Sequence, residues 1–102
     1  MPALGSTDFL AQLIDTFLED TPRMLKEMRR ATQTGEAAIL HREAHSLRSN
    51  SADFGATTLS VLCRELEMMD ESATLEGAVE KIGQAEVEYE RVKEALAALR
   101  SS

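Results

Sequence analysis

The segment that most constrains the fold is residues 75–99, where apolar side chains recur in steps of three and four without a miss. The series comprises Leu75, Ala78, Ile82, Ala85, Tyr89, Val92, Leu96 and Leu99. Such spacing puts side chains on one face of an α-helix, whereas a half-buried strand requires strict alternation. A helix of about 25 residues is about 37 Å long, the length of a helical bundle. The chain is therefore expected to fold as packed helices.

Four further helical stretches precede this segment. Each carries an apolar stripe, and glycine, proline or short polar residues separate one from the next. They run from Asp8 to Asp20, from Pro22 to just before Gly35, from Glu36 to about Ser51, and from Ala56 to Met69. Asp20-Thr21-Pro22 indicates a helix cap followed by proline at the first helical position. The prediction is an all-α protein, an antiparallel up-and-down four-helix bundle with an additional short N-terminal helix.

The length of 102 residues suits one domain with a single hydrophobic core. Hydrophobic residues make up 43% and charged residues 28%, a balance typical of globular rather than disordered chains. We therefore predict one domain spanning residues 1–102, with flexible ends at residues 1–5 and 101–102.

The formal net charge is −7, which disfavours nucleic acid and anionic membranes as partners, because both bind basic surfaces. The single cysteine, Cys63, excludes an internal disulfide and offers no metal-ligand cluster. No apolar run is long enough to span a bilayer, and the first residues do not resemble a signal peptide. A cytoplasmic location is expected.

His41 and His45 lie four residues apart, beside the apolar stripe of the helix expected over residues 36–51. The residues around them are small, so an imidazole there would be accessible to another protein. Spacing alone equally fits two ordinary surface histidines. A shared metal ion is a further alternative, but Glu43 points away from His41 and no third ligand is evident. No metal site is predicted.

Residues 45–56 read HSLRSNSADFGA, and this run resembles the signature helix of histidine-containing phosphotransfer (HPt) domains of bacterial multistep phosphorelays. That helix reads His-x-Leu-Lys-Gly-small-small-x-x-x-Gly-Ala. The similarity continues through residues 17–22 and through Leu59, Cys63, Leu66 and Glu67, so that it covers nearly the whole chain. Arg48 replaces the usual lysine, which preserves the positive charge, and Ser49 replaces the usual glycine.

The resemblance implies that His45 accepts a phosphoryl group from a receiver-domain aspartyl phosphate and passes it to another receiver domain. A neutral imidazole is a suitable nucleophile, and Arg48, one helical turn away, is suited to stabilise charge on the phosphoryl oxygens. The chain would be a monomeric phosphorelay intermediate without autokinase activity, and it would need no cofactor of its own. Mg²⁺ is expected on the partner receiver, and a hybrid sensor histidine kinase is expected as a further partner.

Several residues near His45 are predicted to contact such a partner; they are His41, Arg42, Ala44, Ser49, Ala52 and Gly55. The alternative function is that of a non-catalytic helical interaction module that associates through the long C-terminal helix. In that case both histidines would be incidental.

Overall fold

The computed structural model describes residues 4–69 and 75–101, with side chains described for residues 9–69 and 77–100. This part of the chain folds into four helices, α1 (Leu4–Thr34), α2 (Ala37–Asp53), α3 (Thr57–Met68) and α4 (Leu75–Ser101), and contains no strand. The all-α prediction is confirmed. The ends expected to be flexible lie partly outside the described residues, and α1 already includes Leu4 and Gly5.

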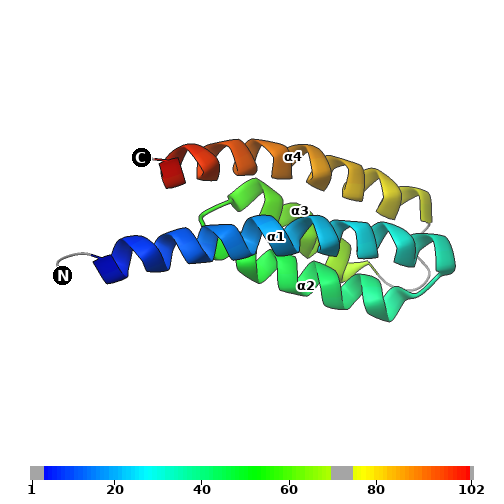
Figure 1. Cartoon of the computed structure of the whole chain (residues 1–102). Coiled ribbons are helices and arrows are strands. Elements are labelled where there is room, and N and C mark those ends of the chain that lie inside the picture. Colours follow the sequence, from blue (N-terminus) through cyan, green and yellow to red (C-terminus); the bar gives the residue numbers. More distant parts are fainter. Residues whose placement is uncertain (1–3, 70–74, 102) are drawn as a thin grey trace.

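Each helix packs against two others: α1 contacts α2 and α4, and α3 also contacts α2 and α4. Helices α1 and α4 run in opposite directions side by side, so that the two chain ends lie at the same end of an elongated molecule (Figure 1). Its extents are 54 × 20 × 18 Å. None of the described helices combines the length and the apolar character that a membrane crossing requires.

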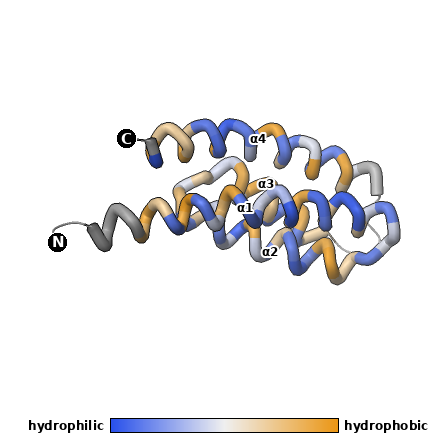
Figure 2. Tube along the Cα trace, viewed as in Figure 1, coloured by the Kyte–Doolittle hydropathy of each residue, from blue (hydrophilic) through white to orange (hydrophobic). Residues whose placement is uncertain are grey.

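The helices meet in one core built from the apolar stripe of each. Hydrophobic residues recur among hydrophilic ones along the helices (Figure 2). These hydrophobic positions supply most of the buried side chains of the core. From α4, the core receives Ala78, Ile82, Ala85, Tyr89 and Leu96, five members of the series that predicted this helix. Leu99, the last member, is 53% exposed.

The predicted helix boundary at Pro22 is wrong, because α1 continues through it as one helix of 31 residues. A separate short N-terminal helix is therefore absent from the described chain. Proline inside a helix leaves the carbonyl four residues earlier without its usual N–H donor. Here that carbonyl belongs to Leu18, and the Tyr89 hydroxyl of α4 donates a hydrogen bond to it at 3.3 Å. A tertiary contact thus satisfies the group that Pro22 leaves unpaired.

The connection between α2 and α3 is a tight turn centred on Gly55, whose φ is +70°. The Ala56 N–H donates to the Ser51 carbonyl at 2.9 Å, and the Gly55 N–H donates to the Ala52 carbonyl at 3.0 Å. This pair of bonds is the Schellman motif, which ends a helix with a left-handed residue. The turn fixes α3 against α2, and the two helices that it joins carry the candidate site.

Candidate functional site

His45 lies on the exposed side of α2. The buried residues of this helix are Leu40, Ala44, Leu47 and Ser51, and they point into the core. His45 follows Ala44 and is therefore turned about 100° away from it. The His45 side chain is 58% exposed. The imidazole is therefore accessible to a molecule approaching from solvent.

One edge of the His45 ring is held by Glu67 of α3. The His45 Nδ1 atom lies 2.7 Å from Oε1 of Glu67, and Nε of Arg48 donates a hydrogen bond to Oε2 at 2.7 Å. Nη2 of Arg48 also lies 3.2 Å from His45 Nδ1. The three side chains form one network, with the carboxylate between the ring and the guanidinium.

These distances determine which ring nitrogen carries the proton. A carboxylate only accepts hydrogen bonds and a guanidinium only donates them, so Nδ1 cannot bond to both Glu67 and Arg48. The contact with Glu67 is the shorter one and is charge-assisted, which favours a proton on Nδ1. In the neutral ring the lone pair then belongs to Nε2. The network therefore leaves a nucleophilic nitrogen on the edge of His45 that faces away from Glu67.

Glu67 is ionised under ordinary conditions. The hydrogen bond from His45, followed by that from Arg48, holds the pKa of this carboxyl below its usual value against the opposing effect of burial. The Glu67 side chain is only 26% exposed, and that of Arg48 is 35% exposed. The two charges are thus partly shielded from water, which strengthens their interaction relative to a fully solvated pair.

His41 lies outside this network. Its Nε2 atom contacts the carbonyl of Met69, the residue that follows α3. A ring nitrogen that faces a carbonyl must donate to it, so His41 ties α2 to the end of α3. No group of three or more potential metal-ligating side chains occurs among the described residues.

The other residues predicted to contact a partner differ in exposure. Arg42, Ser49, Ala52 and Gly55 are exposed. Ala44 is fully buried, so its prediction as a partner contact is wrong; its methyl group belongs to the packing of α2 in the core.

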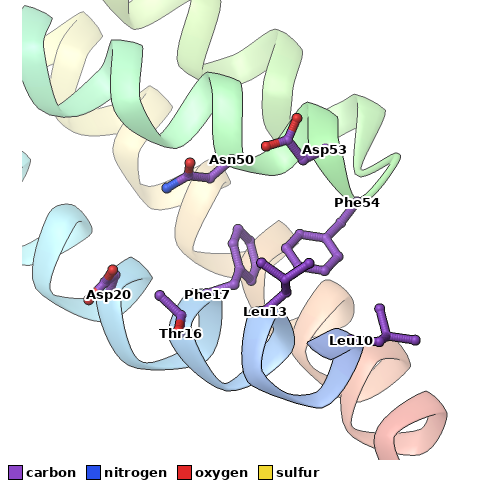
Figure 3. Close-up of a pocket in the computed structure, with 8 residues that line it drawn as sticks. All are labelled: Leu10, Leu13, Thr16, Phe17, Asp20, Asn50, Asp53 and Phe54. Carbon is purple, nitrogen blue, oxygen red and sulfur yellow. The ribbon is translucent and has the colours of Figure 1, made fainter. Parts of the chain in front are cut away.

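A hollow of about 320 Å³ lies between the first half of α1 and the end of α2 (Figure 3). Leu10, Leu13, Phe17 and Phe54 supply its apolar lining, and polar groups line the rest. Leu10 and Leu13 are 42% and 43% exposed, so the hollow is an accessible apolar surface. It opens beside the end of α2 that follows His45.

Residues 12–102 match the family described as Hpt domain. The chain belongs to the Hpt domain family. It is 30% identical over 92 residues to "Histidine-containing phosphotransfer protein 2" of Arabidopsis thaliana, an alignment that covers 87% of this chain and 59% of that protein. The chain thus spans about three-fifths of the length of this relative. The family assigned from residues 45–56 is confirmed.

A solved Hpt structure has the same fold. It is the histidine-containing phosphotransfer protein B (HptB) from Pseudomonas aeruginosa PAO1, with a TM-score of 0.83 and 33% sequence identity. The match covers 89% of this chain and 79% of that one.

In this Hpt domain, the sequence predicted roles for His45 and Arg48 but none for Glu67, which the structure places in contact with both. Glu67 appeared only as part of the family resemblance, because its partners lie on another helix. A usable signal was present: Glu67 directly follows Leu66, a member of the buried stripe of α3. A carboxylate next to a buried stripe lies at a helix–helix boundary, where it needs a partner.

Proposed function

We propose that this chain is a phosphorelay intermediate in which His45 accepts a phosphoryl group from a receiver-domain aspartyl phosphate and passes it to another receiver domain. The observation that carries the proposal is the exposed His45 ring with Nδ1 held by Glu67 at 2.7 Å. This contact favours the tautomer in which Nε2 is the nucleophile. Membership of the Hpt domain family supports the same role.

Phosphoryl transfer depends mainly on placement and on stabilising charge on the phosphoryl oxygens. We assign the second task to Arg48, whose planar guanidinium matches phosphate geometry. The magnesium ion would be bound by the receiver, so this chain would need no cofactor. The phosphoryl group would arrive from the receiver of a hybrid sensor histidine kinase, and the chain itself would have no autokinase activity.

The proposed scaffold is a single domain over residues 1–102, an antiparallel up-and-down four-helix bundle that acts as a monomer in the cytoplasm. Receivers would contact the surface around His45, including the exposed Arg42, Ser49, Ala52 and Gly55. The adjacent hollow would extend this contact (Figure 3). His41 would lie at the border of the surface, since its Nε2 atom is bound to Met69.

The alternative function, association through the C-terminal helix, is less well supported. It requires α4 to offer an apolar face to another protein. Most of the apolar series of α4 is instead buried in the core of the chain itself. The exposed large apolar side chains described on α4 are Val79, Val87 and Leu99, and they are spread around the helix rather than gathered on one face.

The test is transfer of a radiolabelled phosphoryl group from a charged receiver domain. Wild-type protein and the control variant His41→Gln should become labelled, whereas His45→Gln should not. His41 provides a matched control because it is the other histidine of the same helix face and makes a different contact. Equal labelling of both variants, or no labelling of any form across a panel of receivers, would refute the proposal.

A further inference from the structure

Arg64 of α3 is the exception among the arginines of this chain. Every other arginine lies within 3.9 Å of a carboxylate oxygen. Arg64 is exposed, and it forms neither an ion pair nor a side-chain hydrogen bond with any of the residues that the structure describes. Its guanidinium carries a permanent charge and five N–H donors. This charged group is therefore available to a molecule from outside the chain.

Arg64 lies on the same side of the molecule as His45. It follows Ser60 by four residues and precedes Glu67 by three, spacings that put the three on one face of α3. Ser60 donates to the Arg48 carbonyl and Glu67 contacts His45, so this face borders α2. At about 100° per residue, Arg64 is turned roughly 40° from Ser60 and 60° from Glu67, in both cases away from the buried stripe of α3. Arg64 is thus placed on the surface where His45 is exposed.

The charge of this surface differs from that of the whole chain. The chain has 18 acidic and 11 basic residues, a formal net charge of −7. The other two arginines near His45, Arg42 and Arg48, each lie close to a carboxylate of this chain. Arg64 adds a positive charge that no described carboxylate pairs with. A negatively charged protein is therefore repelled by the chain as a whole and attracted by Arg64 at the surface that carries His45.

A receiver domain would bring negative charge to this surface. In the proposed function it carries an aspartyl phosphate and binds Mg²⁺, an ion that proteins hold through carboxylates. The face that it turns towards His45 is consequently rich in acidic groups. This charge is complementary to that of Arg64.

We propose that Arg64 is the docking cation of this domain, which binds a carboxylate at the edge of the receiver's phosphorylation site while the aspartyl phosphate meets His45. Arg64 thereby favours receivers that carry an acidic side chain at that place. This inference rests on the proposed function of His45. Arg64 is a residue of specificity and association in this account, because it contacts the partner and takes no part in the transfer itself.

The geometry of the site separates the tasks of the two arginines. Nε2 of His45 faces away from Glu67 and hence away from α3, the helix that carries Arg64. Arg48 is next to the ring, since its Nη2 atom lies 3.2 Å from Nδ1. Arg48 is therefore the arginine placed to reach the phosphoryl oxygens, and Arg64 is placed to reach the body of the receiver.

The test is the second-order rate of phosphoryl transfer at low ionic strength, from whichever receiver in a panel of charged receivers labels the wild type fastest. Arg64→Gln should slow this transfer about threefold and Arg64→Glu about tenfold, because an exposed charge at an interface acts mainly on association. Arg64→Lys keeps the charge and should retain most of the rate. In about 0.5 M salt, which screens exposed charges, Arg64→Gln should transfer as fast as wild type.

The matched control is Lys93→Gln. Lys93 is also an exposed cation without an ion pair among the described residues, but it lies with Pro22 and Tyr89 along the contact between α1 and α4. Its replacement changes the net charge by the same amount and should leave the transfer rate unchanged. Once the receiver has been removed, the phosphohistidine lifetime should be the same in wild type, Arg64→Gln and Lys93→Gln.

Four results would overturn the docking role of Arg64 alone. They are a wild-type rate for Arg64→Gln at low salt, an equal loss of rate in Lys93→Gln, a loss in Arg64→Gln that persists at high salt, and a changed phosphohistidine lifetime in isolated Arg64→Gln. The last result would place Arg64 on the phosphoryl group instead of the receiver. Absence of labelling in wild type across the panel would instead overturn the proposed function, and this inference with it.

Discussion

Replacement of Tyr89 by phenylalanine tests why α1 can run unbroken through Pro22. The change removes one hydroxyl and keeps the ring, which is 4% exposed and lies 6.1 Å from the ring of Phe17. The Leu18 carbonyl would then lose its donor, because Pro22 has no N–H to offer. An unsatisfied buried group costs about 1–3 kcal/mol, and the bond length of 3.3 Å indicates a weak bond, so we expect a loss of about 1 kcal/mol.

The assay is urea unfolding followed by circular dichroism, carried out as a double-mutant cycle with Pro22→Ala. Alanine at this position restores an N–H that can bond to the Leu18 carbonyl, so Tyr89→Phe should cost close to nothing in that background. The coupling free energy between the two positions should therefore be about 1 kcal/mol. An equal cost of Tyr89→Phe in both backgrounds, or no cost in the wild type, would refute the reasoning.

Two further predictions concern charge and buried polarity. Arg48→Ala should shorten the phosphohistidine lifetime or slow transfer by about tenfold, because the phosphoryl oxygens lose a charge-assisted partner. The helicity measured by circular dichroism should stay unchanged. A variant with the lifetime and transfer rate of the wild type would exclude a role for Arg48 in stabilising the phosphoryl charge. Thr21→Val should raise the free energy of unfolding by about 1 kcal/mol, because the fully buried Thr21 hydroxyl has no hydrogen-bond partner among the side chains and backbone groups that the structure describes. Loss of stability in urea unfolding of this variant would contradict that prediction.

The sequence was sufficient for those parts of the fold that depend on local periodicity. The apolar series of residues 75–99 predicted α4, and glycine at position 55 correctly marked the end of α2. Pro22 misled the prediction because the local rule for proline assumes that the freed carbonyl stays unpaired. Its partner, Tyr89, lies 71 residues from Leu18 along the chain, and no local pattern connects them. Here tertiary contact overrides local preference.

The same distinction applies to the site. His45 and Arg48 lie one turn apart on a single helix, so their proximity could be read from spacing. Glu67 is 22 residues from His45, and its contact depends on how α3 packs against α2. The error at Ala44 has a related cause. A small residue next to His45 is compatible both with an open surface and with tight packing, and only the neighbouring helices decide between them.

The contacts between α2 and α3 explain how the side chains of His45, Arg48 and Glu67 are kept together although none of them is fully buried. The Schellman turn at Gly55 sets where α3 starts, and the Ser60 hydroxyl donates to the Arg48 carbonyl at 3.2 Å. These contacts fix the register that brings Glu67 to His45 two turns further along α3. Because α2 carries the proposed nucleophile, His45, and α3 carries the carboxylate that contacts it, the geometry of the candidate site depends on how these two helices pack.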